Sequence, residues 1–123
     1  MTKDNLDNLF VSNDQLNKEL LFEILESKIK ITEEGEVMIF GEFDSFQKIL
    51  LYILGRKVLL IKNKLETEEA GPAEISKNTG ISLGTVKVYV KKLEREQVLM
   101  NKNGKYKIPN FILPKVNERF KNG

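Results

Sequence analysis

Residues 71–97 read GPAEISKNTGISLGTVKVYVKKLEREQ. Pro72 suits the first turn of a helix, where Glu74 would interact favourably with the positive end of the helix dipole. Gly80 can adopt a positive φ without strain, and the Ser82 hydroxyl can cap a following helix. The stretch therefore predicts two helices joined by a tight turn. Their expected ranges are 72–78 and 83–97.

The apolar residues of this stretch are spaced so that both helices can pack on one core. Two helices joined by a short turn that contains glycine form a helix-turn-helix, and we expect that motif here. The residues expected to face inward are Ile75, Ile81, Val86, Tyr89, Val90 and Leu93. The opposite face of the second helix carries Thr85, Lys87, Val88, Lys91, Lys92 and Arg95. A helix that binds nucleic acid presents hydrogen-bond donors on such a face.

A short β-hairpin is expected directly after the second helix. Residues 98–101 and 106–108 have strand-like composition, and Asn103-Gly104 between them is the strongest short signal for a hairpin turn. Lys102 and Lys105 flank this turn, so the tip of the hairpin is basic.

Together these segments resemble the winged helix-turn-helix DNA-binding family, and most closely its small archaeal and bacterial transcriptional regulators. The resemblance covers residues 44–108, with 82–97 as recognition helix and 98–108 as wing. It rests on Glu74-Ile75, Thr79-Gly80-Ile81, Gly84-Thr85-Val86, Leu93-Glu94 and Gly104-Lys105-Tyr106. The chain departs from the family at Ser76, where alanine is usual, and at Thr79, where an aliphatic residue is usual.

The resemblance implies a DNA-binding surface formed by the recognition helix and the wing. Residues expected near base edges in the major groove are Ser82, Gly84, Thr85, Lys87 and Val88, and those near phosphates are Lys91 and Lys92. The wing residues expected on the adjacent backbone or minor groove are Lys102, Asn103 and Lys105. An ordinary solvated face is the alternative for the lysines, and the shared position of helix and wing lysines favours nucleic acid. Tyr89 is expected to pack at the core or its boundary.

The N-terminal part of the chain predicts a helix and a second hairpin. Residues 14–27 place leucine and isoleucine at three- and four-residue spacing, which is typical of an amphipathic helix. Residues 28–32 alternate apolar and polar side chains, and 37–40 form a second short strand. The acids between them, Glu33, Glu34 and Glu36, are expected to be a solvated hairpin tip.

A long helix is expected over residues 45–66, capped by Asp44 with Gln47 three positions later. The alternative is a helix that ends at Leu54, followed by a strand over 57–61. The helix is favoured because Gly55 is the only turn signal inside it, and one glycine costs a helix only about 1 kcal/mol. Residues 66–71 are interpreted as an acidic linker in which Glu68 and Glu69 have no further role.

The tail predicts a short helix that begins near Pro114, with Leu113, Val116 and Phe120 on one side. This helix either packs back on the core or lies in a dimer interface, and the apolar stripe of residues 16–25 leaves the same choice. A homodimer is expected because small regulators of this type commonly dimerise.

Composition excludes many kinds of enzyme. The 123 residues contain no cysteine and no histidine, so thiolate zinc sites, disulfides and Ser-His-Asp triads are absent. Neither a cofactor, a metal nor a small-molecule effector is indicated. The N-terminus lacks the apolar stretch of a signal peptide, and the apolar run 49–61 is too short to span a membrane. We therefore expect a cytoplasmic protein with no membrane partner.

The net charge of +2 hides a strong asymmetry. Residues 1–70 contain 9 Lys and Arg against 14 Asp and Glu, a net charge of −5, and residues 71–123 contain 11 against 4, a net charge of +7. A basic segment of this kind indicates a polyanionic partner.

The sequence thus predicts a mainly helical α+β protein in three parts. Residues 1–43 form an acidic extension for dimerisation or partner contact, 44–108 form the winged helix-turn-helix, and 109–123 form a helical tail. The expected function is non-enzymatic binding of double-stranded DNA by a transcriptional regulator. A winged-helix protein-interaction module and an RNA-binding protein are the alternatives.

Overall fold

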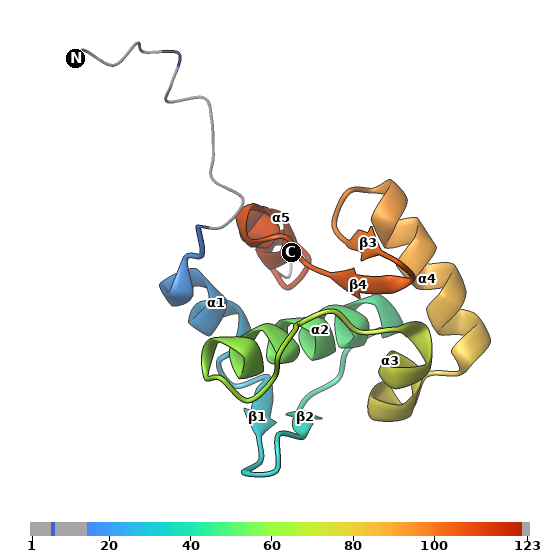
Figure 1. The fold of residues 1–123 in the computed structure, drawn as a ribbon, viewed down its shortest axis with the longest axis horizontal. Helices are drawn as coiled ribbons and strands as arrows, with labels where there is room; N and C mark the ends of the chain where they lie inside the picture. The colour runs from blue at the N-terminus through green and yellow to red at the C-terminus, as the bar shows by residue number, and fades with distance from the viewer. Residues whose placement is uncertain (1–5, 7–14, 122–123) are drawn as a thin grey trace.

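The computed structural model describes Leu6 and residues 15–121. The helices are α1 (Lys18–Leu25), α2 (Ser45–Ile61), α3 (Pro72–Thr79), α4 (Leu83–Arg95) and α5 (Leu113–Glu118), with a 3-10 turn η2 (Asn110–Ile112) before α5. Two separate antiparallel hairpins are formed by β1 (Ile29–Ile31) with β2 (Val37–Ile39) and by β3 (Met100–Lys102) with β4 (Lys105–Lys107). The mainly helical α+β fold is therefore confirmed (Figure 1).

Helix α2 is the central element of the fold. Its N-terminus has a full capping box, because the Asp44 carboxylate accepts from the Gln47 backbone N–H at 2.8 Å and the Gln47 side chain accepts from the Asp44 N–H at 3.0 Å. The helix continues through Gly55, so residues 57–61 are not a strand. Its middle turns are buried on nearly all sides, with α1 and the first hairpin near its C-terminal end and α4 near its N-terminal end (Figure 1).

Two of the predicted helices end earlier than their apolar periodicity indicates. Helix α2 ends at Ile61 rather than residue 66, because Asn63 has φ 60° and the N–H groups of Asn63 and Lys64 donate to the carbonyls of Leu60 and Leu59. This pattern is a Schellman motif, which stops a helix at a residue in the left-handed region. Helix α4 ends at Arg95 by the same arrangement around Gln97, whose φ is 63°.

Helix α1 is shorter than the predicted 14–27 at both ends. Asn17 caps it, since its side-chain oxygen accepts from the Leu20 N–H at 3.0 Å, and Ser27 leaves the helix with φ 67°. Asp14, the first residue of the predicted range, lies outside the described residues. The predicted hairpin follows, and in it Ile29 pairs with Ile39.

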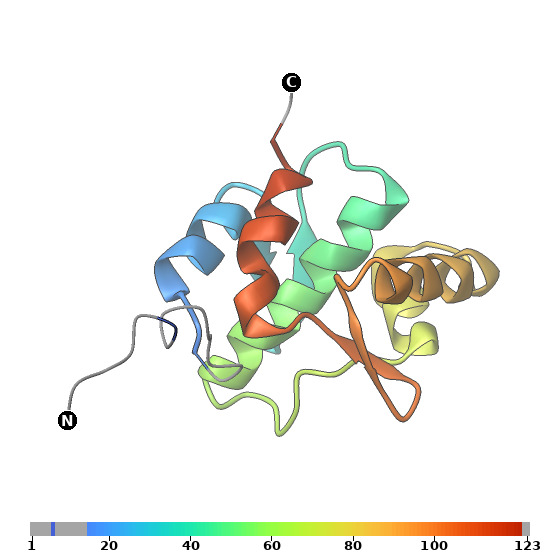
Figure 2. The ribbon, with the colours of Figure 1, turned by 90° about the horizontal axis from the view of Figure 1, so that it is seen from above.

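The tail lies on the core of its own chain. Leu113 and Val116 of α5 are fully buried, and the Phe120 ring meets Phe43 edge-on with centroids 6.0 Å apart. Arg119 pairs with Glu96 just after α4. Helix α5 therefore fills the space between α1 and α4 (Figure 2).

Candidate nucleic-acid interface

The turn between α3 and α4 is held by side chains as well as by backbone. Gly80 has φ 79°, as a tight turn at this position requires. The Ser76 hydroxyl donates to the Ile81 carbonyl at 2.6 Å, and the Thr79 hydroxyl donates to the Ile75 carbonyl at 2.7 Å. The two residues that depart from the family pattern therefore stabilise the turn.

The start of α4 is organised by two hydroxyl groups. Ser82 accepts from the Thr85 backbone N–H at 3.3 Å, and its own hydroxyl donates to the Thr85 hydroxyl at 2.9 Å. Ser82 is exposed and Thr85 is half-buried. These hydroxyls stand at the end of α4 that also carries exposed Gly84, where no Cβ crowds an approaching surface.

One exposed stripe runs along α4, opposite the side that packs on the core. Val86, Val90 and Leu93 are buried, and four residues at helical spacing form the outer stripe. These are Gly84, Val88, Lys91 and Arg95, and Val88 is 61% exposed. Lys87 is exposed beside the stripe. Arg95 was predicted on this face but not among the DNA contacts, and its position in line with Lys91 adds it to the candidate site.

Tyr89 and Lys92 lie on the flank of α4 that faces α2. The Tyr89 ring stacks on Phe46 with centroids 4.0 Å apart and an interplanar angle of 6°. The Lys92 ammonium lies 5.4 Å from the centroid of the same Phe46 ring, a cation–π arrangement. Tyr89 is half-buried at the core boundary, and the Lys92 side chain is directed towards α2 while remaining exposed.

The second hairpin is the predicted wing. Its turn residues Asn103 and Gly104 have φ 55° and 86°, as a two-residue turn with two positive φ values requires, and Asn101 accepts from the Gly104 N–H at 2.9 Å. The side chains of Lys102, Asn103 and Lys105 are exposed. Val98 and Leu99 are buried in the link from α4 rather than part of the strand.

The segment before α3 pairs with the wing. Ala70 and Tyr106 exchange backbone hydrogen bonds of 2.9 and 2.8 Å, so the predicted linker lies along β4. Its Glu69 carboxyl is partly buried, which opposes ionisation, but its own N–H, the Thr67 hydroxyl and the nearby charges of Lys102 and Lys107 lower the pKa of Glu69 overall. The Glu69 carboxylate of the linker therefore lies close to two wing lysines, Lys102 and Lys107.

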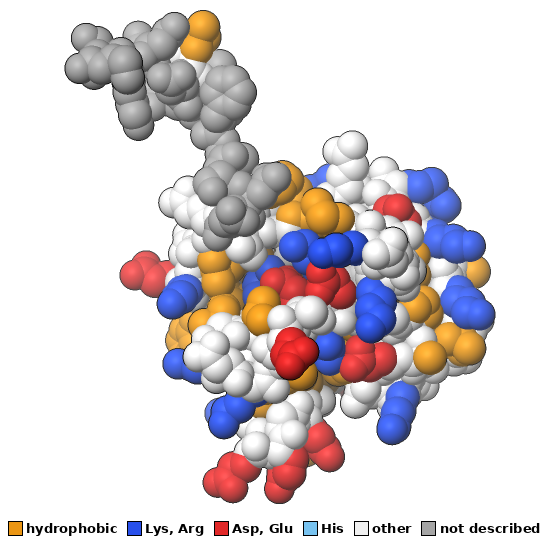
Figure 3. Space-filling view, in the orientation of Figure 1, with side chains coloured by type: hydrophobic (Ala, Val, Ile, Leu, Met, Phe, Trp, Pro, Cys, Tyr) orange, Lys and Arg blue, Asp and Glu red, His pale blue; other side chains and the backbone are white. Residues whose placement is uncertain are grey.

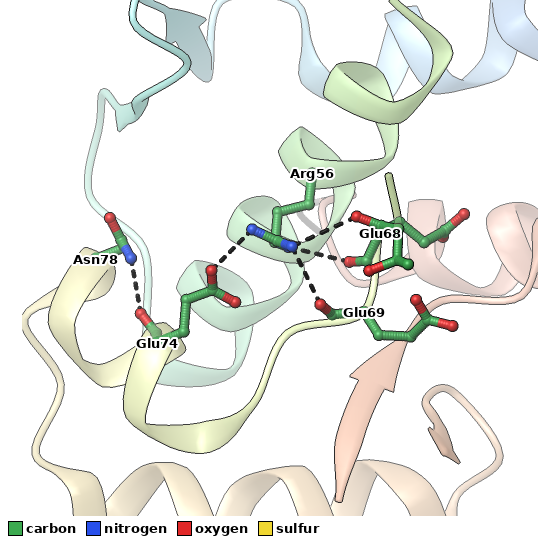
Figure 4. Close-up of polar contacts among 6 residues, drawn as sticks. Arg56, Glu68, Glu69, Glu74 and Asn78 are labelled. Carbon is green, nitrogen blue, oxygen red and sulfur yellow. Dashed lines mark hydrogen bonds and ion pairs between the residues drawn. The ribbon is translucent and has the colours of Figure 1, made fainter. Parts of the chain in front are cut away.

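Arg56 of α2 binds this same segment (Figure 4). Its guanidinium donates to the carbonyls of Thr67, Glu68 and Glu69 at 3.4, 3.1 and 3.1 Å, and it pairs with the Glu74 carboxylate of α3 at 2.9 Å. Arg56 thereby connects α2 to both the linker and the first helix of the motif.

Glu68 is not a plain linker residue, which corrects the interpretation from sequence. Its carboxylate pairs with the buried Lys57 ammonium at 2.5 Å. The unpredicted roles of Arg56 and Lys57 had one sequence signal, because two adjacent cations interrupt the most apolar run of the chain.

The lysines of α4 and the wing gather at one side of the molecule, whereas the acids of the β1–β2 loop project at another (Figure 3). The described residues contain no group of three or more acidic side chains placed to hold a metal ion. None of the helices within residues 15–121 has the length and apolar character needed to cross a membrane.

A family model described as winged helix-turn-helix DNA-binding matches residues 67–100, which include α3, the turn and α4. Neither the curated proteins nor the solved structures contain a match to the chain. Residues 67–100 thus match a winged helix-turn-helix DNA-binding domain, and the hairpin β3–β4 follows in the position of a wing.

Proposed function

We propose that this protein is a transcriptional regulator that inserts α4 into the DNA major groove and places the wing on the adjacent backbone or minor groove. The observation that carries the proposal is the uninterrupted exposed stripe of α4 beside the exposed wing lysines. Among the described residues, the ion pairs use no lysine of α4 or of β3–β4. Their ammonium groups are therefore available to phosphates.

The side chains divide into two kinds of contact. Ser82, Gly84, Thr85, Lys87 and Val88 belong to the first turns of α4 and would approach base edges. Lys91, Lys92 and Arg95 lie further along and would contact phosphates, as would Lys102, Asn103 and Lys105 of the wing. Lys92 would reach a phosphate on the side of α2, because its ammonium lies over Phe46.

The proposal includes a homodimer whose two α4 helices contact two half-sites, and a non-enzymatic role for each copy. Residues 44–108 would supply DNA binding, and 1–43 would supply contact with a partner. Helices α1 and α5 already bury their apolar stripes within one chain. Sedimentation of the free protein, and of complexes with duplexes that carry one or two sites, measures the stoichiometry.

The decisive experiment is fluorescence anisotropy with a labelled random duplex. Lys87, Lys91 and Lys92 changed together to Glu should weaken binding by at least about 100-fold, because each removed phosphate contact also loses counterion release. The matched control changes Lys18, Lys30 and Lys62 to Glu, which alters the net charge equally but lies on other elements, and it should retain most of the affinity.

Unchanged binding by a triple variant with normal circular dichroism would refute the proposed interface. Competition with duplex RNA of equal length separates DNA binding from RNA binding, since the narrow major groove of RNA does not admit α4.

A further inference from the structure

An apolar groove lies at the end of the molecule away from α4. It encloses about 840 Å³ between α1, β1 and the last turns of α2. Its apolar lining consists of Leu21, Phe22, Leu25, Ile29, Ile31, Val58 and Ile61. Phe22 is 64% exposed although it lies beside buried Leu21 and Leu25. An exposed aromatic ring next to a hollow is a common anchor for a protein partner.

The charged side chains of the groove are predominantly basic. Lys18, Lys30 and Lys62 come from three different elements, and Glu26 is the one acid among the lining residues. The N-terminal half of the chain is acidic overall, so this cluster of lysines is opposite in sign to its surroundings. In Figure 3, lysines alternate with apolar side chains over the α1 end of the molecule.

The groove lies along the outer edge of β1, on which no strand pairs within residues 15–121. The β1 residues Ile29, Lys30 and Ile31 line it, and no residue of β2 does. The Lys28 carbonyl accepts from the Phe40 N–H at 2.8 Å, and the Thr32 N–H donates to the Glu36 carbonyl at 2.9 Å, so both residues face the other strand. In an antiparallel pair the bonded positions alternate, so the N–H and C=O groups of Ile29 and Ile31 point away from β2. They are positioned to pair with a further strand.

We propose that this groove binds an extended segment of another protein that adds to the edge of β1 as a third strand. Its apolar side chains would contact Phe22 and the groove floor, and acidic residues beside them would pair with Lys18, Lys30 and Lys62. Main-chain pairing supplies affinity in this mode of recognition, and the side-chain contacts supply specificity.

Charge argues against a second copy of this chain as the occupant. In a symmetric dimer through this groove, the same patch of both copies would meet, and the two patches, each with three lysines and one glutamate, would repel each other. An acidic partner removes that repulsion.

The groove and the DNA-binding face can be occupied together. Phe46, which contacts α4, lies in the first turn of α2, whereas Ile61 of the groove is its last residue. Fifteen residues of helix separate the two by about 22 Å. The bound segment would therefore join a partner protein to the DNA-bound regulator.

The test is selection of a random short-peptide display library on the full-length protein. We expect enriched peptides to combine Asp or Glu with Leu, Ile, Val or Phe. The variant with Lys18, Lys30 and Lys62 changed to Glu should instead select peptides rich in Lys or Arg. Absence of enrichment, or the same peptides on both proteins, would overturn the proposal.

Affinity measurements on an enriched peptide locate the contact. Phe22→Ser should weaken binding about tenfold, the loss expected for one aromatic anchor. Met38→Ser is the matched control, because Met38 of β2 is an apolar side chain with 45% exposure that does not line the groove. Equal loss in both variants would contradict the assignment, and retained DNA binding by each variant verifies the fold.

Hydrogen exchange tests the strand geometry. Peptide binding should slow exchange at the Ile29 and Ile31 amides, and unchanged exchange there would exclude strand addition. A dimer that forms without peptide and dissociates in Phe22→Ser would assign the groove to a second copy and overturn the proposal.

Discussion

Lys57 is a charged side chain in the middle of the apolar core. It is 2% exposed, and its ammonium donates to the Glu68 carboxylate and to the Asn110 side-chain oxygen, both at 2.5 Å. Burial lowers the pKa of Lys57, and the hydrogen bond and charge of Glu68 partly offset this effect. One side chain of α2 thus connects the linker before α3 with η2 after the wing.

Removing only one partner of this pair should be costly. Glu68→Ala leaves a buried ammonium without its counter-charge, and we expect the free energy of unfolding to fall by about 3 to 5 kcal/mol. Replacing both residues, as in Lys57→Met with Glu68→Leu, should recover most of the loss. Urea unfolding of the two variants measures the difference, and a loss below about 1 kcal/mol for Glu68→Ala would show that the pair contributes little.

Gly55 of α2 lies so close to the first hairpin that the packing of α2 and the position of β2 depend on each other. A Cβ built at Gly55 would lie 2.7 and 2.8 Å from the two methyl carbons of Val37, which is closer than packed carbons tolerate. Helix propensity alone predicts that Gly55→Ala stabilises α2 by about 1 kcal/mol. We expect destabilisation by about 1 to 3 kcal/mol instead, because β2 must move away.

The compensating substitution makes this prediction specific. Val37→Ala removes the two methyl groups, so Gly55→Ala should cost less in a Val37→Ala background than in the natural protein. Thermal unfolding of the four proteins of this cycle gives the coupling. If the effects of Gly55→Ala and Val37→Ala on stability are simply additive, the contact between residues 55 and 37 is not the cause of the destabilisation.

Arg56 is expected to position the DNA-binding elements rather than touch DNA. Arg56→Gln removes the ion pair to Glu74 and the guanidinium hydrogen bonds to the carbonyls of Glu68 and Glu69. The positions of α3 and the wing relative to α2 should therefore be less well fixed. We expect DNA affinity to fall about fivefold to tenfold while the salt dependence stays unchanged, since no phosphate contact is removed. A reduced salt slope would show that Arg56 contacts DNA directly.

Local signals predicted the elements better than their connections. The Asp44–Gln47 box, Gly80 with Ser82, and Asn103-Gly104 each specify a cap or turn within four residues, and all three occur as expected. The helix ends after α2 and α4 were missed because Asn63 and Gln97, rather than glycine, take the left-handed conformation there. The contacts of Glu68 and Ala70 depend on partners far away in the sequence, and no local pattern reveals them.

The separation of charge across the molecule predicts how DNA affinity responds to salt concentration. The slope of log affinity against log salt should decrease by about 0.9 for each phosphate contact removed. Lys91→Gln and Lys105→Gln should each produce that change, because both side chains are exposed at the proposed interface. Lys62→Gln, on the far end of α2, should leave the slope as it is. Titrations at four salt concentrations distinguish these outcomes, and equal slopes for all three variants would indicate binding through overall charge only.

The pairing of Ala70 with Tyr106 brings together the two ends of the segment that holds α3, α4 and the wing turn. Both ends of that segment therefore lie at one place, so the segment can be exchanged as a unit. Residues 71–105 could be exchanged for the matching segment of another winged helix-turn-helix protein without changing the Ala70–Tyr106 pairing. The inward-facing residues of the new α3 and α4 would still have to fit α2. Such an exchange would replace the surface of α4 and the wing turn while the groove between α1, β1 and α2 keeps its lining residues.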